Sequence, residues 1–267
     1  VCAMILSAQL HERYDKAHLS YSSIKQALAD MAQFDRYMKG ELRYTSDALN
    51  FGTLYDMLLF EREKAMDTYI VLSNDKILDA CSEKTRNSKR PQMTNEFRER
   101  KTFMAEQASA SDKILCSTDD WKMANEMIER LHECGLIQSH MTGDYQVEFN
   151  EDIQTPVGPV RVKGFLDCLG DGYITDSKST KSVSKFRYSV RDFGYDIQAY
   201  IYTTVFGIKD FYWVAQEKTY PYLPALIKCT ENTLFTGEMK FQDAVKRIHK
   251  FLNEDEKPTI FFEEFEV

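Results

Sequence analysis

The first half of the chain has apolar residues spaced as they are on amphipathic helices. Ile24, Leu28 and Met31 would share one helix face, and the serine-rich segment 20–23 predicts where that helix begins. The apolar segment 49–60 predicts a buried helix. Two further helices are expected over residues 95–109 and 119–135.

Two features interrupt this helical pattern. Residues 73–93 are polar and rich in turn formers, which predicts a mobile loop. Gly52 lies inside the expected buried helix, which predicts close packing or the close approach of another backbone.

The spacing of apolar residues changes near residue 144 from a helical period to alternation. Residues 145–149 alternate as a half-buried strand does, and Gly170-Asp171-Gly172 predicts the turn of a hairpin. The remaining expected elements are strands over 160–168 and 173–178, a helix over 182–206, strands over 210–216 and 222–229, and a final helix over 231–253.

This order of elements predicts an α/β fold in which helices flank a central mixed sheet, with a helical N-terminal half. Because the strands need the helices to cover them, we expect a single domain over residues 1–267. Its parts would be a mainly helical part (1–140), a sheet core (141–230), and a C-terminal helix and tail (231–267).

Composition narrows the class of protein. With 43% hydrophobic residues among 267, the chain can bury a substantial core. No apolar run approaches the length of a membrane span, and no basic region precedes the weakly apolar start, so we expect no membrane association and a cytoplasmic location. The six cysteines are scattered without a Cys-x-x-Cys pair, which favours reduced, mostly buried thiols.

The net charge of −8 disfavours a protein that merely coats DNA, so local charge is more informative. Residues 84–101 carry seven cations and two carboxylates, which fits a solvated face as well as a DNA contact. Residues 161–191 carry seven cations and three carboxylates around the candidate site, where DNA contact is the better interpretation.

The candidate chemistry lies on the expected hairpin. Side chains alternate along a strand, so Asp176 and Lys178 would share one face, and Asp167 on the neighbouring strand could approach them. Two carboxylates suit Mg²⁺, which prefers oxygen ligands and keeps several waters. Lys178 could then orient or deprotonate the attacking water, or stabilise charge on a phosphate. Gln198 and Tyr202 would share a face of the following helix.

These motifs resemble those of the PD-(D/E)XK nuclease superfamily. The resemblance rests on Gly164–Asp167, Asp176–Lys178 and the run 192–202, and is strongest to the RecE-like exonucleases (exodeoxyribonuclease VIII) and more distant to lambda exonuclease. It implies a PD-(D/E)XK, restriction-endonuclease-like core. It also implies that two acidic residues bind Mg²⁺, a lysine assists the water, and a Gln-x-x-x-Tyr helix completes the site; here these are Asp167, Asp176, Lys178, Gln198 and Tyr202.

The resemblance extends to three weaker positions. Ser22 lies in a serine-rich start that resembles the region binding the substrate end. Asp56 stands where RecE-like members often have histidine, so it is a candidate metal ligand; the alternative is that it caps or solvates a helix. Glu148 on the first strand is a further candidate ligand, or else an outward-facing strand residue. Candidate phosphate contacts are Ser22, Lys181, Lys185, Arg187 and Arg191.

By this resemblance we expect a phage-derived exonuclease that uses Mg²⁺, with Mn²⁺ as a substitute. It would digest linear double-stranded DNA 5′ to 3′ and leave 3′ single-stranded tails for recombination in the bacterial host cytoplasm. Its partners would be DNA ends and a single-strand annealing recombinase, and it would assemble as a ring of three or four subunits. Two other functions stay open: a structure-specific or restriction-type endonuclease, and a non-catalytic module that binds DNA or docks a recombinase.

Overall fold

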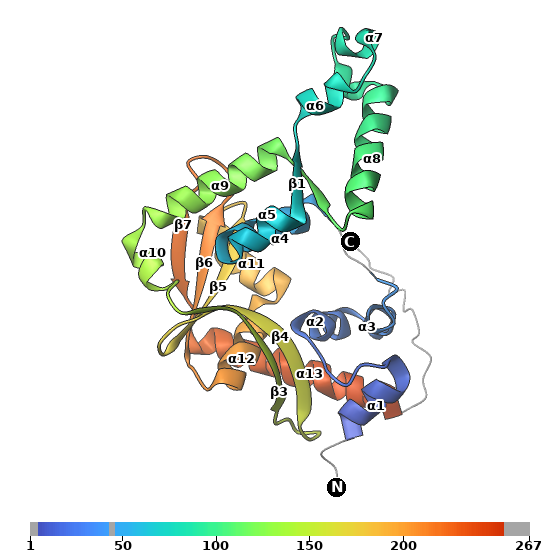
Figure 1. Ribbon diagram of the computed structural model, residues 1–267. Helices are drawn as coiled ribbons and strands as arrows, with labels where there is room; N and C mark the ends of the chain where they lie inside the picture. The colour runs from blue at the N-terminus through green and yellow to red at the C-terminus, as the bar shows by residue number, and fades with distance from the viewer. Residues whose placement is uncertain (1–4, 43–45, 254–267) are drawn as a thin grey trace, which may run out of the picture. The chain divides into compact units, whose positions relative to one another are not determined.

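The computed structural model describes residues 5–42 and 46–253, and its contacts divide into two compact units (Figure 1). The first unit is drawn from Val1–Thr45, Gly135–Ala215 and Pro224–Val267, and the second from Ser46–Cys134 and Gln216–Leu223. Two contact units are compatible with one folding domain, so the single-domain interpretation stays a prediction.

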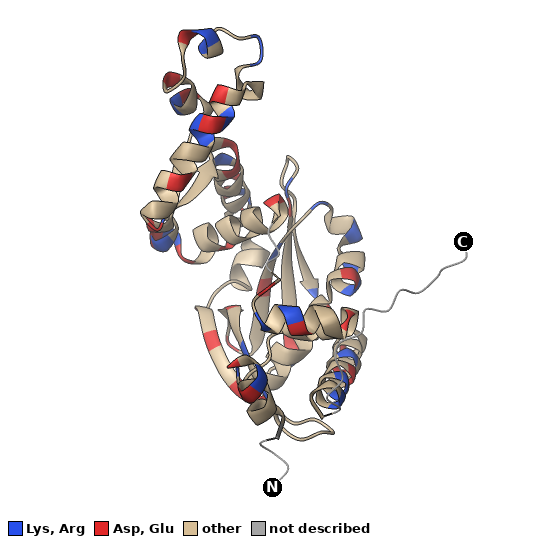
Figure 2. Cartoon of the chain, turned by 90° about the vertical axis from the view of Figure 1, so that its right-hand side faces the viewer, with Lys and Arg blue, Asp and Glu red and all other residues tan. Residues whose placement is uncertain are grey.

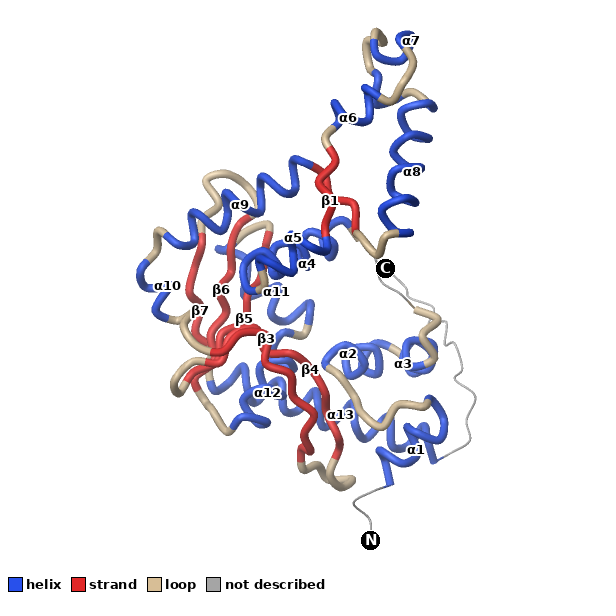
Figure 3. The backbone as a smooth tube through the Cα atoms, viewed as in Figure 1, coloured by secondary structure: helices blue, strands red, loops and turns tan. Residues whose placement is uncertain are grey.

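The first unit contains a five-stranded sheet and helices that cover it (Figure 3). Its strands are β3 (Asp144–Ile153), β4 (Val160–Leu169), β5 (Tyr173–Thr180), β6 (Asp210–Glu217, whose last two residues belong to the second unit) and β7 (Pro224–Lys228). Its helices are α1 (Ile5–Tyr14), α2 (Tyr21–Ala29), α3 (Met31–Met38), α10 (Gly135–Ser139), η3 (Val183–Lys185), α11 (Phe186–Phe193), α12 (Tyr195–Phe206) and α13 (Glu231–Asn253).

The strands lie in the order β3-β4-β5-β6-β7. β3 and β4 form a long antiparallel hairpin, and β4 and β5 form a second one that pairs Cys168 with Thr175 and Leu169 with Ile174. The chain then passes through α11 and α12 before returning as β6, so the sheet is mixed. A mixed sheet flanked by helices, with a helical N-terminal half, confirms the predicted fold class.

The core of the first unit follows from alternation along β4. Val160, Val162, Leu166 and Cys168 are buried, whereas Phe165 between them is exposed. A Cβ on Gly237 of α13 would lie 2.1 Å from the Asp196 carbonyl oxygen, so only glycine lets α13 approach α12 this closely.

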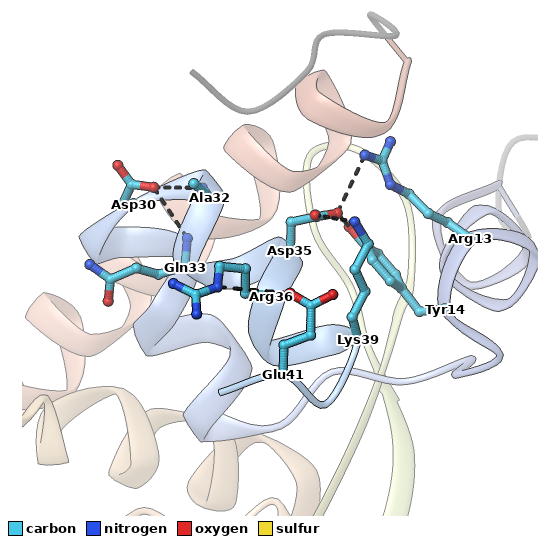
Figure 4. A network of polar contacts seen from close by, with 9 residues as sticks. All are labelled: Arg13, Tyr14, Asp30, Ala32, Gln33, Asp35, Arg36, Lys39 and Glu41. Atoms are coloured by element: carbon cyan, nitrogen blue, oxygen red, sulfur yellow. Dashed lines mark hydrogen bonds and ion pairs between the residues drawn. The ribbon is translucent and has the colours of Figure 1, made fainter. Parts of the chain in front are cut away.

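A buried carboxylate ties the N-terminal helices together (Figure 4). Asp35 of α3 accepts hydrogen bonds from the Tyr14 hydroxyl (2.8 Å) and from Lys39 Nζ (2.5 Å), and its Oδ1 lies 3.4 Å from Arg13 Nη2. Burial alone would raise the pKa of Asp35, but these three donors outweigh it and lower that pKa. Asp30 caps the start of α3 by accepting from the Ala32 and Gln33 amides.

The second unit has its own small cores. Its elements are α4 (Asp47–Phe60), α5 (Arg62–Thr68), β1 (Tyr69–Leu72), α6 (Asn74–Asp79), α7 (Glu83–Arg86), η2 (Pro91–Met93), α8 (Asn95–Ala110), β2 (Ile114–Ser117) and α9 (Thr118–His132). α4 packs against α9, and β1 pairs in parallel with β2. The buried Gln216 side chain accepts from the Tyr55 hydroxyl (2.5 Å) and donates to the Met127 carbonyl (2.7 Å).

Three expectations differ from the structure. Residues 73–93 hold α6, α7 and η2, so the predicted loop there is wrong. A Cβ on Gly52 would meet no described atom within 4 Å, so the predicted close packing is wrong as well. The predicted helix over 182–206 is broken at Gly194, which has a left-handed conformation (φ 75°) and separates α11 from α12.

The structure describes five of the six cysteines and the lengths of the helices. In the described ranges all five cysteines are free thiols, and only Cys134 is not buried; Cys2 lies outside those ranges. None of the helices between residues 5 and 253 is both long and apolar enough to cross a bilayer.

Candidate active site

The candidate site lies where β4 and β5 separate. Toward its start, β4 exchanges backbone hydrogen bonds with Leu19, whose amide donates to the Arg161 carbonyl (2.9 Å) and whose carbonyl accepts from the Lys163 amide (2.8 Å). Toward its end, β4 pairs with β5 from Cys168 onward. Between these two pairings, the edge of β4 at residues 164–167 is free to take side-chain partners.

Two side-chain contacts fill that interval. The Tyr202 hydroxyl donates to the Phe165 carbonyl (2.7 Å), and the Ser177 amide of β5 donates to Asp167 Oδ2 (2.8 Å). The Asp167 carboxylate therefore replaces a backbone acceptor and is fixed beside β5.

Asp176 is the second carboxylate, and it is 1% exposed. Its Oδ1 accepts from Gln198 Nε2 (2.9 Å), and its Oδ2 forms an ion pair with Lys178 Nζ. Burial raises the pKa of Asp176 to about 7; the Lys178 ammonium opposes this rise, and the Asp167 charge adds to it. Burial also raises the pKa of Asp167, against Lys178 and the Ser177 amide. The two carboxylates thus repel each other across one small site.

Lys178 supplies the compensating charge. Its side chain is 18% exposed, and its Nζ lies 5.1 Å from the centre of the Tyr195 ring. Burial would lower the pKa of Lys178, but attraction to Asp176 and Asp167 outweighs it and raises that pKa. Lys178 is therefore a firmly held ammonium at neutral pH in the metal-free protein.

Gln198 and Tyr202 connect α12 to both carboxylate-bearing strands. Gln198 Nε2 donates to the Tyr202 hydroxyl (3.0 Å) as well as to Asp176, and Tyr202 in turn reaches β4 through Phe165. Because the two residues are one helical turn apart, they act together from one face of α12.

Gly164 of the Gly-x-x-Asp motif has a steric role. A Cβ at this position would lie 2.7 Å from the ring of Phe149, which packs over the glycine. The same ring meets Tyr202 edge-on, with ring centres 5.4 Å apart. Glycine therefore lets Phe149 hold Tyr202 in place above β4.

The donor set fits Mg²⁺. Gln198 Oε1 is a buried oxygen that accepts no hydrogen bond from a described residue, Asp176 Oδ2 is a buried carboxylate oxygen paired with the Lys178 ammonium, and Asp167 adds a second carboxylate. Described residues nowhere bring three or more His, Cys, Asp or Glu side chains together as a metal centre. Two carboxylates suffice for Mg²⁺, which completes its octahedron with water and substrate oxygens.

The weaker candidates lie in different settings. Glu148 is exposed, pairs with Phe165 in the register, and forms an ion pair with the half-buried Lys163 (2.8 Å). Asp56 is half-buried on α4 of the second unit. A metal-binding role stays a prediction for both.

The candidate phosphate contacts all lie in the unit that holds the site. Ser22 is half-buried in the first turn of α2, where Ser20 forms the predicted cap. Four exposed cations follow β5 through η3 and α11: Lys181, Lys185, Arg187 and Arg191. Arg191 pairs with Asp192 (3.0 Å), and Arg187 stacks on Tyr188.

Sequence reasoning missed three residues around the carboxylates. Gln146 donates Nε2 to Asp167 (3.3 Å) from a backbone with φ 50°, which is unusual for a residue other than glycine. Tyr195 lies beside Lys178. Tyr21 is held by a hydrogen bond from its hydroxyl to the Phe193 carbonyl; burial raises its pKa, and Lys178 opposes that rise. Tyr21, beside the serine cap, and Tyr195, within the run 192–202, each had a sequence signal, whereas Gln146 had none.

In this site a strand hairpin brings Asp167 beside an Asp-x-Lys strand, and a Gln-x-x-x-Tyr helix braces both strands. This is the arrangement of the PD-(D/E)XK superfamily. The chain belongs to the family described as "PDDEXK-like domain of unknown function (DUF3799)", whose model matches residues 20–263.

Solved structures agree with this fold. A proposed exonuclease from Eubacterium rectale superimposes with a TM-score of 0.63 at 19% identity, covering 94% of this chain and 86% of that one. An alkaline exonuclease from Laribacter hongkongensis (TM-score 0.29, 10% identity, 68% and 89% covered) and the protein SSO0001 (0.31, 11%, 81% and 91%) are too distant to support a conclusion. No curated protein matches the chain.

Proposed function

We propose that this protein is a metal-dependent exonuclease that hydrolyses the phosphodiester bonds of linear double-stranded DNA. The observation that carries the proposal is the meeting of Asp167, Asp176 and Lys178 at the separation of β4 and β5. Membership of a PDDEXK-like family supports nuclease chemistry, and the likeness to a proposed exonuclease supports the fold.

Asp167 and Asp176 would hold Mg²⁺ or, as a substitute, Mn²⁺. Bound there, the cation would offset carboxylate repulsion, polarise the scissile phosphate and acidify a water. Asp56 and Glu148 are the further ligands that the family resemblance implies.

The other side chains have separate tasks. Lys178 would orient the attacking water and stabilise charge that develops on the phosphate. Gln198 fixes the rotamer of Asp176 through its amide, and Tyr202 fixes Gln198 and the β4 carbonyl. Ser22, Lys181, Lys185, Arg187 and Arg191 would contact DNA phosphates.

Polarity and partners complete the proposal. The enzyme would digest from a 5′ end and leave a 3′ single-stranded tail, which a single-strand annealing recombinase would then use. A phage origin, a bacterial cytoplasmic site of action and a ring of three or four subunits belong to the same proposal.

The test is digestion of a linear duplex labelled at either its 5′ or its 3′ end, beside a closed circular duplex, with Mg²⁺ or with EDTA. We expect metal-dependent early release of the 5′ label and an intact circle. Cutting of the circle would replace the exonuclease with an endonuclease. Binding of DNA without cleavage under either metal would replace it with a non-catalytic module.

A further inference from the structure

The second unit carries a basic arm that the catalytic proposal does not use. We call residues 73–110, which hold α6, α7, η2 and α8, the arm. Its tip is residues 84–90, which contain four cations and no carboxylate. Figure 2 shows the loop at the outer end of the arm in blue. Seven exposed cations lie on the tip and on α8: Lys84, Arg86, Lys89, Arg90, Arg98, Arg100 and Lys101.

These cations form no close ion pairs in the described part of the chain, although Arg100 is near enough to Glu96 to help lower the pKa of that carboxyl. None of the seven forms an ion pair with a described residue. The nearby carboxylate of Glu96 is already occupied, because it accepts from the Ser82 amide (2.8 Å), the Ser82 hydroxyl (2.6 Å) and the Thr85 hydroxyl (2.5 Å). The positive charge is therefore available to a partner.

The fold brings two separate basic segments together. The Glu96 contacts join the start of α8 to α7, and Ile77, Cys81 and Phe97 form a small core beneath them. Burial raises the pKa of the Cys81 thiol, while the guanidinium groups of Arg86 and Arg100 oppose that rise. Both arginines thus lie near one point of the arm, although they are 14 positions apart in the sequence.

A cluster of like charges on the arm is electrostatically unfavourable, and binding of a polyanion would relieve the repulsion. Arg98 and Lys101, three apart on α8, lie on the same face and repel each other. The chain as a whole has a net charge of −8, so the arm is an exception to its general charge rather than an extension of it. Neutralising such a cluster releases counterions from a nucleic acid, which favours binding.

We propose that the arm binds the phosphate backbone of double-stranded DNA as a sequence-independent grip. Arginine forks and lysine ammonium groups match phosphate oxygens, and Asn87 and Ser88 in the tip add neutral polar groups. This inference rests on the proposed action on DNA, to which it adds a binding surface on the second unit.

The test compares two variants that each lose four cations from the second unit. The arm variant is Lys84→Ala/Arg86→Ala/Lys89→Ala/Arg90→Ala. The matched control is Arg62→Ala/Lys64→Ala/Lys122→Ala/Arg130→Ala. It removes cations of α5 and α9, each of which already has a side-chain partner. Affinity for a fluorescent duplex of about 30 bp is measured in EDTA, so that no cleavage occurs, across about 50–200 mM salt.

We expect the arm variant to bind at least about tenfold more weakly. The slope of log affinity against log salt should become shallower by about 3 to 4, since each lost phosphate contact removes about 0.9. The control should keep both the slope and the affinity of the parent protein, and circular dichroism should show both variants folded.

Unchanged affinity and slope in the arm variant would overturn the proposal, as would an equal loss in the control. Displacement of DNA by an acidic peptide of equal charge as readily as by unlabelled duplex would assign the arm to an acidic protein instead. Because binding is measured without metal, a protein that shows arm-dependent binding but no cleavage contradicts only the nuclease assignment.

Discussion

At the scale of single residues, the Tyr202 hydroxyl links helix α12 to the edge of β4. Tyr202→Phe keeps the ring that packs on Phe149 but leaves the Phe165 carbonyl without its donor. We expect the variant to lose about 1–2 kcal/mol of unfolding free energy. DNA cleavage should fall about tenfold, because a misplaced supporting group weakens catalysis. Urea unfolding and single-turnover cleavage check the two effects; wild-type cleavage would show that the hydroxyl does not position the site.

Two glycines give opposite expectations for the same substitution. Gly164→Ala would press a Cβ into the Phe149 ring, and we expect a loss of about 1–3 kcal/mol with weaker cleavage. Gly52→Ala meets no described atom and lies inside helix α4, so we expect a gain of about 0.5–1 kcal/mol. Thermal unfolding of both variants is the measurement, and equal shifts for the two would refute the steric role of Gly164.

Asp176 should make stability depend on pH in the metal-free protein. Its pKa rises to about 7 on folding, so the folded state holds this proton more tightly than the unfolded chain does. The stabilisation that this tighter proton binding gives the folded state is fully present below the pKa of the unfolded carboxyl, about 4, and is lost as pH rises through about 7. In EDTA, wild type should therefore lose stability relative to Asp176→Asn over that range.

Mg²⁺ should reverse this trend, because carboxylates bind metal in their ionised form. The check is urea unfolding of both proteins at several pH values, with EDTA and with Mg²⁺. A difference between wild type and Asp176→Asn that does not change with pH would contradict the burial of a titrating carboxyl.

The sequence predicted which residues form the site wherever the alternation of side chains along a strand was sufficient to place them. The period of two along residues 173–178 put Asp176 and Lys178 on one face, and the structure pairs them. Gln146 and Tyr195 could not be found this way, because the first depends on an unusual backbone angle and the second on a break in a helix. The prediction from Gly52 was wrong because a glycine in a helix need not mark a close contact.

At the scale of elements, α12 carries the Gln-x-x-x-Tyr pair and must be held firmly. Asp196 in its first turn is buried and forms an ion pair with Lys240 of α13 (2.7 Å). Lys240→Ala leaves that carboxylate without its cation, and we expect a loss of about 1–3 kcal/mol. Lys228→Ala breaks an exposed pair with Asp210, which solvent screens, and should cost clearly less than Lys240→Ala. Chemical unfolding compares the two; equal costs would mean that the Asp196 pair does not brace α12.

Most elements followed from periodicity, and the exceptions have local causes. The final helix lies at its predicted residues, 231–253, because its apolar stripe is long and regular. β1 and β2 were missed, since strands of four residues carry too little pattern. Helix α8 of the arm lies close to its predicted residues, 95–109. The short helices α6 and α7 were missed because N-terminal residues such as the cap Ser73, rather than apolar faces, define where they begin.

At the scale of the whole molecule, the distribution of charge bears on the proposed binding of DNA. If an acidic chain is to bind DNA as proposed, its contacts must be concentrated, and the cations of α11 and of the arm would supply such contacts within each unit. The separation of β4 from β5 depends on Leu19, far away in the sequence, so no local pattern could have predicted it.

The most direct test of the account is the rate at which Lys178→Ala cleaves a linear duplex in Mg²⁺, beside an exposed control, Lys246→Ala on α13. We expect the Lys178 variant to lose cleavage by at least about 10³-fold, since it removes a charge that acts on the transition state. Its DNA affinity should stay within about threefold of wild type, and the control should cleave normally. Cleavage by Lys178→Ala at the wild-type rate would contradict the assignment of this site.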